Sequence, residues 1–111
     1  EGGETLPSGL QVATVVKGDG ETPVPSSTVK VHYEGRLADG TVFDSSYARG
    51  EPISFGLTQV IPGWTEGLQH MQVGGKAELV IPPHLGYGAS GTGPIPGNAT
   101  LYFTVELLGI E

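Results

Sequence analysis

Residues 29–34 are Val29-Lys30-Val31-His32-Tyr33-Glu34. Apolar and polar side chains alternate along this stretch, which is the pattern of a strand with one buried face and one solvated face. Asp39-Gly40 follows as a strong tight-turn signal, because glycine tolerates the positive φ that such a turn needs. Residues 41–43 (Thr-Val-Phe) then return to an extended pattern. The segment therefore predicts a β-hairpin.

The same alternation predicts further strands on both sides of this hairpin. Their apolar positions are Leu10, Val12 and Val16; Ile53 and Phe55; Ala77, Leu79 and Ile81; and Leu101, Phe103, Val105 and Leu107. One segment has helical spacing instead, because Trp64, Leu68 and Met71 are four and three residues apart. Pro62 suits the first turn of this helix, and Gly74-Gly75 is expected to end the segment.

These elements predict an α+β fold in which about five strands pack against one short helix. No helix joins successive strands in a repeating way, so the sheet should be mainly antiparallel. The length of 111 residues is that of one domain. Residues 1–8 are polar and glycine-rich and are expected to be a linker or a truncated N-terminal extension. Residues 9–111 are expected to form the domain.

Composition excludes several classes of function. The chain has no cysteine, which rules out disulfides, zinc–thiolate sites and thiol nucleophiles. Five Lys and Arg stand against 12 Asp and Glu, so the basic footprint of a nucleic-acid or anionic-membrane binder is missing. The apolar runs are too short to span a bilayer, and no membrane insertion is expected. The chain begins at Glu1, which suggests a piece processed or excised from a longer protein.

Three sequence features could indicate a dinucleotide site, a metal site or a hydrolase, but in each case the sequence context argues against that function. Residues 86–91 match the spacing Gly-x-Gly-x-x-Gly, but Pro94 and Pro96 follow where a dinucleotide site needs a helix. The three histidines (His32, His70 and His84) share no defensible ligand spacing, so no metal site is predicted. Ser45 and Ser46 lack a nucleophile elbow, which argues against a hydrolase. No cofactor is expected.

Six aromatic residues lie at or beside the predicted loops: Tyr33, Phe43, Phe55, Trp64, Tyr87 and Phe103. Large apolar residues are usually buried, so composition favours a role in the core. Asp44 directly follows Phe43 and could be an ordinary turn residue that hydrogen-bonds nearby backbone. The residues alone leave both interpretations, core and site, open.

A resemblance narrows these alternatives. Five segments are similar to signature segments of the FKBP-type prolyl isomerases: residues 31–35 (Val-His-Tyr-Glu-Gly), 40–46 (Gly-Thr-Val-Phe-Asp-Ser-Ser), 60–64 (Val-Ile-Pro-Gly-Trp), 86–89 (Gly-Tyr-Gly-Ala) and 99–101 (Ala-Thr-Leu). They occur in the family's order, and the resemblance runs from about Ser8 to Glu111. Residues 49–52 and 59–67 look most like the bacterial, Mip-like branch. That branch implies a periplasmic or cell-envelope location, with the cytoplasm as the alternative, and a possible dimer through a missing N-terminal segment.

The family resemblance implies a five- or six-stranded antiparallel sheet wrapped around a short helix, with an apolar pocket between them. Substrate-binding residues carried over from the family are Tyr33, Phe43, Ile53, Phe55, Val60, Ile61, Trp64, Tyr87, Ile95 and Phe103. Trp64 would be the pocket floor, and Ile95 would line the rim. Ile53 stands where an aromatic is common. Catalytic roles would fall to Asp44, Tyr87, Phe103 and Ile61, with the Tyr87 hydroxyl and the Ile61 N–H bonding substrate carbonyls.

The implied activity is cis–trans isomerisation of Xaa-Pro bonds in peptides and unfolded proteins, with macrolides such as tacrolimus or rapamycin as inhibitors. Rotation must overcome a barrier of about 18–20 kcal/mol but makes and breaks no covalent bond. A protein without a cofactor, metal or nucleophile can therefore catalyse it. Two alternatives stay open: a prolyl-peptide or macrolide-binding chaperone module with little turnover, and a structural β-rich domain.

Overall fold

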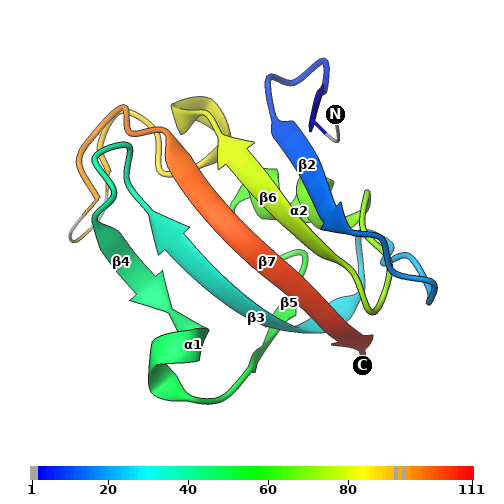
Figure 1. Ribbon diagram of the computed structural model, residues 1–111. Helices are drawn as coiled ribbons and strands as arrows, with labels where there is room; N and C mark the ends of the chain where they lie inside the picture. Colours follow the sequence, from blue (N-terminus) through cyan, green and yellow to red (C-terminus); the bar gives the residue numbers. More distant parts are fainter. Residues whose placement is uncertain (1–2, 92, 94) are drawn as a thin grey trace.

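The computed structural model describes residues 3–91, 93 and 95–111 (Figure 1). Within them, one antiparallel sheet has the strand order β1-β2-β6-β7-β3-β4, and β5 also pairs with β3. The strands are β1 (Gly3–Thr5), β2 (Gln11–Val16), β3 (Thr28–Arg36), β4 (Val42–Ser45), β5 (Ile53–Gly56), β6 (Lys76–Ile81) and β7 (Leu101–Ile110). The helices are α1 (Ser46–Arg49), α2 (Pro62–Leu68) and the 3-10 turn η1 (Pro83–Leu85).

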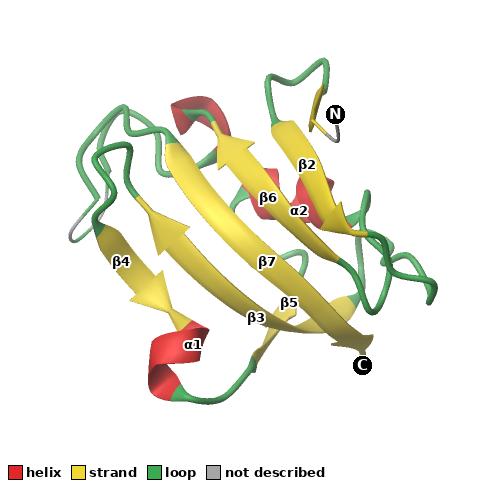
Figure 2. Ribbon diagram, in the orientation of Figure 1, coloured by secondary structure: helices red, strands yellow, loops and turns green. Residues whose placement is uncertain are grey.

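Helix α2 lies behind β6 and β2 on one face of the curved sheet (Figure 2). The space between them is filled by the apolar positions that alternation singled out on the central strands. Tyr33, Leu79, Phe103 and Val105, for example, are all at most 4% exposed. The helix comes close to the sheet because Gly63 and Gly67 face it, and a Cβ at Gly63 would stand 2.6 Å from the side chain of Ile81. The predicted α+β class, with an antiparallel sheet around a short helix, is confirmed.

Leu10, Val12 and Val16 were expected on one face of a strand, and this prediction is wrong for Val16. Leu10 and Val12 are buried, but Val16 is 49% exposed. Pairing between β2 and β6 shifts from Thr14↔Ala77 to Val16↔Lys76, so one extra residue is inserted in β2. A β-bulge of this kind reverses the faces of the residues that follow it.

The helical segment is shorter than its spacing suggests, and it is joined by a second helix. Helix α2 ends at Leu68, and Met71 is buried beyond its end rather than within it. Helix α1 occupies residues 46–49, where no helical spacing of apolar residues marks it. Its signals are local: Ser45 accepts a hydrogen bond from the N–H of Ala48 as N-cap, and Gly50 closes the turn at φ 81°.

Residues 3–8 pack on the domain, although their composition suggests a linker. Strand β1 pairs with β2, and Leu6 is 7% exposed. Ser8 bridges two distant elements, because its hydroxyl donates to Glu66 Oε1 (2.6 Å) and its carbonyl oxygen accepts from His84 Nε2 (2.7 Å). The boundary between the domain and any preceding segment stays a prediction.

Candidate active site

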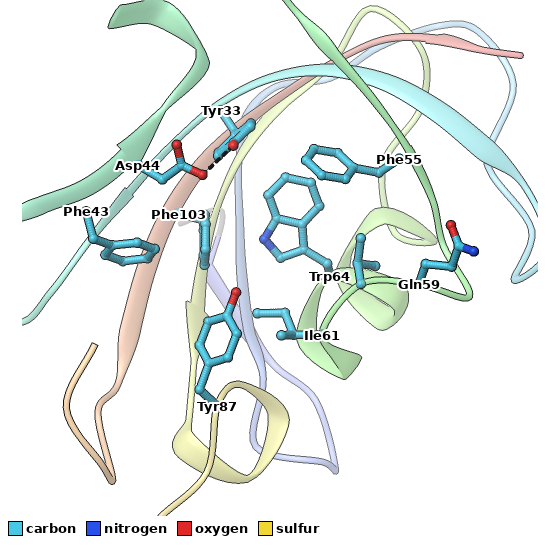
Figure 3. Close-up of a pocket in the computed structure, with 10 residues that line it drawn as sticks. Tyr33, Phe43, Asp44, Phe55, Gln59, Ile61, Trp64, Tyr87 and Phe103 are labelled. Atoms are coloured by element: carbon cyan, nitrogen blue, oxygen red, sulfur yellow. Dashed lines mark hydrogen bonds between the residues drawn. The ribbon is translucent and has the colours of Figure 1, made fainter. Parts of the chain in front are cut away.

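A cavity of about 370 Å³ opens between β3, β4, β5, β7, helix α2 and the segment that follows η1 (Figure 3). Ten residues line it: Tyr33, Phe43, Asp44, Phe55, Gln59, Val60, Ile61, Trp64, Tyr87 and Phe103. Most of their side chains are apolar or aromatic. A concave apolar site with few polar groups is the usual form of a ligand pocket.

Two neighbouring residues of β4, Phe43 and Asp44, both line the cavity. Regular alternation would place them on opposite faces of the strand. The register between β3 and β4 shifts from Gly35↔Asp44 to Arg36↔Val42, which leaves Phe43 as an extra residue. This irregularity turns both side chains toward the same space.

Trp64, in the first turn of α2, is the centre of the aromatic packing. Its ring meets those of Tyr33, Phe55 and Phe103 edge-on, with centroids 5.2, 5.2 and 5.3 Å away and interplanar angles of 84°, 74° and 86°. Phe43 meets Phe103 in the same manner at 5.6 Å. Edge-to-face contacts are the favoured geometry of aromatic pairs. Each ring therefore fixes the orientation of its neighbours, and the floor of the cavity is rigid.

The indole Nε1 of Trp64 is buried and has no hydrogen-bond partner within the described residues. Figure 3 shows this nitrogen on the side of Phe103, whose ring is perpendicular to the indole. This N–H is the one polar group of Trp64, and the aromatic rings around the indole make the rest of the pocket floor apolar.

Gly35 on β3 makes room for two of these rings. A Cβ at this position would stand 2.6 Å from Phe43 and 2.7 Å from Phe103. Both distances are below van der Waals contact, so a larger residue would displace the rings. Glycine at this position is a packing requirement of the pocket.

One edge of the cavity carries a hydrogen-bonded group of three side chains. The Tyr33 hydroxyl donates to Asp44 Oδ2 (2.6 Å), and Arg49 Nη1 donates to Asp44 Oδ1 (2.6 Å). Arg49 Nη2 also donates to the Tyr33 hydroxyl oxygen (3.0 Å), and the guanidinium lies 5.8 Å from the centre of the tyrosine ring. Both oxygens of the Asp44 carboxylate are thus held in place.

This arrangement sets the charge of the group. Partial burial acts to raise the pKa of Asp44, but the hydrogen bonds from Tyr33 and Arg49 and the arginine charge outweigh it, so this pKa is lowered. Burial and the bond to Asp44 raise the pKa of Tyr33. At neutral pH the site therefore holds a carboxylate, a neutral phenol and a guanidinium. Asp44 is suited to act as a fixed acceptor and not as a proton donor.

Replacing Arg49 by methionine is expected to raise the pKa of Asp44, because a charge and a donor are lost. In the folded protein this pKa is depressed, so the carboxylate stabilises the fold above its unfolded pKa of about 3.9 and loses that effect as the pH falls through the folded pKa. The variant should be less stable than the original protein near neutral pH, and the difference should shrink in acid. Both side chains are over 40% exposed (44% and 42%), so solvent screening keeps the effect small.

Chemical denaturation at about pH 7 and about pH 3 measures this difference. Arg36→Met is the matched control, since Arg36 pairs with Glu34 outside the lining of the pocket. A stability difference for Arg49→Met that is the same at both pH values would contradict the assignment.

The structure brings together most of the residues that the resemblance pointed to. Tyr33, Phe43, Asp44, Phe55, Val60, Ile61, Trp64, Tyr87 and Phe103 share the cavity. Tyr87 is 38% exposed, and its hydroxyl points into the cavity (Figure 3). Ile61 is the N-cap of α2, and no hydrogen bond from its N–H is found in the part of the chain that the structure describes. Both groups are therefore free to bond a ligand.

Two expected residues do not line the cavity, and two others were missed. Ile53 is half-buried against the core, and Ile95 is 5% exposed within it. Gln59 lines the cavity, and Arg49 holds Asp44. The signal for Arg49 was available, because the Ser45 cap and Gly50 predict the single helical turn that returns Arg49 to Asp44.

Within the described residues, no group of three His, Cys, Asp or Glu side chains could hold a metal ion. No helix there is long and apolar enough to cross a membrane.

Residues 19–108 match the family model of the FKBP-type peptidyl-prolyl cis-trans isomerases. The chain is 54% identical over 111 residues to the FKBP-type peptidyl-prolyl cis-trans isomerase FkpA of Escherichia coli (strain K12), and it covers 41% of that relative's length. The crystal structure of FkpA from Escherichia coli superimposes with a TM-score of 0.97 over all of this chain and 52% of the solved one.

A peptidyl-prolyl cis-trans isomerase structure from Pseudomonas syringae pv. tomato str. DC3000 is 40% identical, with a TM-score of 0.92 over 99% of this chain and 81% of the other. These relatives are bacterial, in agreement with the branch that the sequence resembles. The family match and the high identity over the full chain point to the same family as the residues that line the aromatic pocket. This chain therefore belongs to the FKBP-type peptidyl-prolyl cis-trans isomerase family.

Proposed function

We propose that this chain accelerates cis–trans rotation about Xaa-Pro bonds of peptides held in the aromatic cavity. The observation that carries the proposal is the cavity itself, in which the rings of Tyr33, Phe55 and Phe103 meet Trp64 edge-on. A rigid apolar floor of this kind suits the ring of a proline, which has no N–H to satisfy. Membership of the family supports the same reaction.

The acceleration comes from a difference in how well the cavity stabilises the planar amide and the twisted transition state. Resonance makes the planar amide more polar than the twisted one, and water supports that polarity. An apolar cavity supports the planar form less well, so it favours the twisted transition state. A tenfold acceleration needs only about 1.4 kcal/mol of such preference.

The polar groups at the rim orient the peptide. The Tyr87 hydroxyl and the Ile61 N–H are proposed to bond the carbonyls that flank the rotating bond. The carboxylate of Asp44, which Tyr33 and Arg49 hold in place, is proposed to face the carbonyl that turns. No proton has to move, so the ionised carboxylate acts through position and charge alone.

Proline-limited refolding of a model protein tests this function. We expect catalytic amounts of the chain to speed the slow phase and a macrolide such as rapamycin to abolish the effect. Binding of rapamycin without any acceleration would overturn the enzyme assignment and favour a binding module with little turnover. A folded chain that neither binds nor accelerates would reject both.

Natural clients and location belong to the whole protein, because this chain spans 41% of its FkpA relative. We propose unfolded, proline-containing proteins as clients and macrolides as inhibitors. Resemblance to the Mip-like branch supports a periplasmic or envelope location over a cytoplasmic one. Fractionation of the full-length protein in its own cells would decide, since recovery with cytoplasmic markers would contradict this location.

A further inference from the structure

Strand β3 changes its partner at the mouth of the pocket. On one side it pairs with β7 over most of its length. On the other side it pairs with β5 through Thr28–Val31 and with β4 through Glu34–Arg36. His32 and Tyr33 fall between the two and have no strand partner on that side among the described residues. The gap coincides with Tyr33, whose ring lines the cavity.

The side chain of Ser46 fills this gap. Its hydroxyl oxygen accepts the backbone N–H of Tyr33 at 2.7 Å and lies 3.3 Å from the Tyr33 carbonyl oxygen. His32 Nδ1 lies 2.8 Å from the same oxygen. Ser46 is 0% exposed, so solvent does not reach its hydroxyl in the folded chain. One hydroxyl thus takes the place of a missing strand for the residue that projects into the pocket.

Ser46 is also the first residue of α1, and this ties the gap to the charged group at the rim. Helix α1 carries Arg49, which holds both Asp44 and the Tyr33 hydroxyl. Tyr33 is therefore fixed twice by one helical turn, at its backbone through Ser46 and at its hydroxyl through Arg49. Loss of the first contact should loosen the second, because both depend on how α1 lies against β3.

We infer that Ser46 is a positioning residue for the isomerase site, which holds Tyr33 and Asp44 in the geometry that the twisted amide meets. The inference rests on the proposed function for its effect on rate. Ser46 does not line the cavity, so it acts through Tyr33 and α1 and not by contact with the peptide.

The experiment compares Ser46→Ala with Ser27→Ala. Ser27 makes the same kind of bond, because its hydroxyl accepts the N–H of Val24 at 2.9 Å, but it lies outside the cavity lining. Two quantities are measured in each folded variant: the titration of the Asp44 carboxyl by NMR, and kcat/KM for an Xaa-Pro peptide. We expect Ser46→Ala to raise the pKa of Asp44 and to lower kcat/KM about tenfold, the effect of losing buried hydrogen bonds. Ser27→Ala should change neither.

Ser46→Cys covers the case in which the alanine variant does not fold. A thiol fills nearly the same volume but is a weak hydrogen-bonding group, so the packing stays and the bonds to Tyr33 weaken. The same two shifts are expected, with a smaller size. A folded Ser46 variant in which Asp44 titrates as before would overturn the inference. Because the titration does not depend on activity, this result would overturn it even if the original chain proves to be no isomerase.

Discussion

Replacing Phe103 by alanine is expected to lower both the free energy of unfolding and the isomerase activity. The ring is 4% exposed and touches Trp64, Phe43 and Tyr33. Removal of a buried phenylalanine typically costs about 3–5 kcal/mol, while small domains have about 5–15 kcal/mol in total. The variant should therefore lose a large part of its stability and melt at a lower temperature, and its activity is measured well below that temperature. Without this ring, Trp64 and Phe43 lose their fixed orientation, and kcat/KM should fall by at least tenfold.

Phe103→Leu separates the two effects. Leucine keeps most of the buried apolar volume but offers no ring for edge-to-face contact. We expect it to recover much of the stability and little of the activity. Thermal melts and peptide kinetics on both variants provide the comparison. Full activity in the folded alanine variant would show that Phe103 belongs to the core only.

Replacing Asp44 by alanine is expected to cut kcat/KM by about tenfold or more with a small change in stability, as for loss of a fixed charge at a reacting group. Asp44 is the common acceptor of the Tyr33 hydroxyl and the Arg49 guanidinium. Its removal takes away the only acceptor for the hydroxyl within the residues that the structure describes, and it frees the guanidinium to move. The stability change should stay small, because the Asp44 side chain is 42% exposed.

Asp39→Ala is the control for this substitution. Asp39 is an exposed carboxylate in the hairpin turn before β4, where its Oδ1 accepts the N–H of Thr41 at 2.9 Å. It removes the same charge from the same hairpin but does not line the cavity. Equal losses of activity in the two variants would point to a general charge effect and would remove Asp44 from the site.

Alternation predicted the central strands well because those strands are buried on one face only. From Val29 to Tyr33 in β3 and from Leu101 to Leu107 in β7, every second residue is apolar and buried, so the period of two is visible in the sequence. The start of α2 was equally visible, through Pro62 and the spacing of Trp64 and Leu68. Local pattern is sufficient where one face meets the core and the other meets water.

The pattern failed where tertiary contacts override it. Val16 faces outward because of a β-bulge that the sequence of β2 does not predict. Met71 has the spacing of one more helical turn, but α2 ends at Leu68. Met71 is buried because the segment after the helix packs on the core. Ile95, which the family resemblance and not the pattern placed at the rim, is 5% exposed and packs in the core. Whether such a side chain faces the core or solvent depends on its neighbours in the folded chain, which the periodicity of the sequence does not show.

The pocket itself illustrates the same limit. Its residues come from four strands or their ends, one helix and the segment after η1, and no spacing along the chain relates Tyr33 to Phe103. From the residues alone, the six aromatic side chains could belong either to the core or to a binding site. The family resemblance placed them together, and the geometry adds Arg49, Gln59 and Ser46, which the resemblance did not supply.

The most direct test of the central claim is NMR exchange spectroscopy on a short Xaa-Pro peptide, with and without the chain. Our account predicts faster exchange between the cis and trans signals in the presence of the protein, and a return to the uncatalysed rate when rapamycin fills the cavity. Exchange at the uncatalysed rate, from a protein shown by its melting curve to be folded, would contradict the claim that this aromatic pocket catalyses rotation.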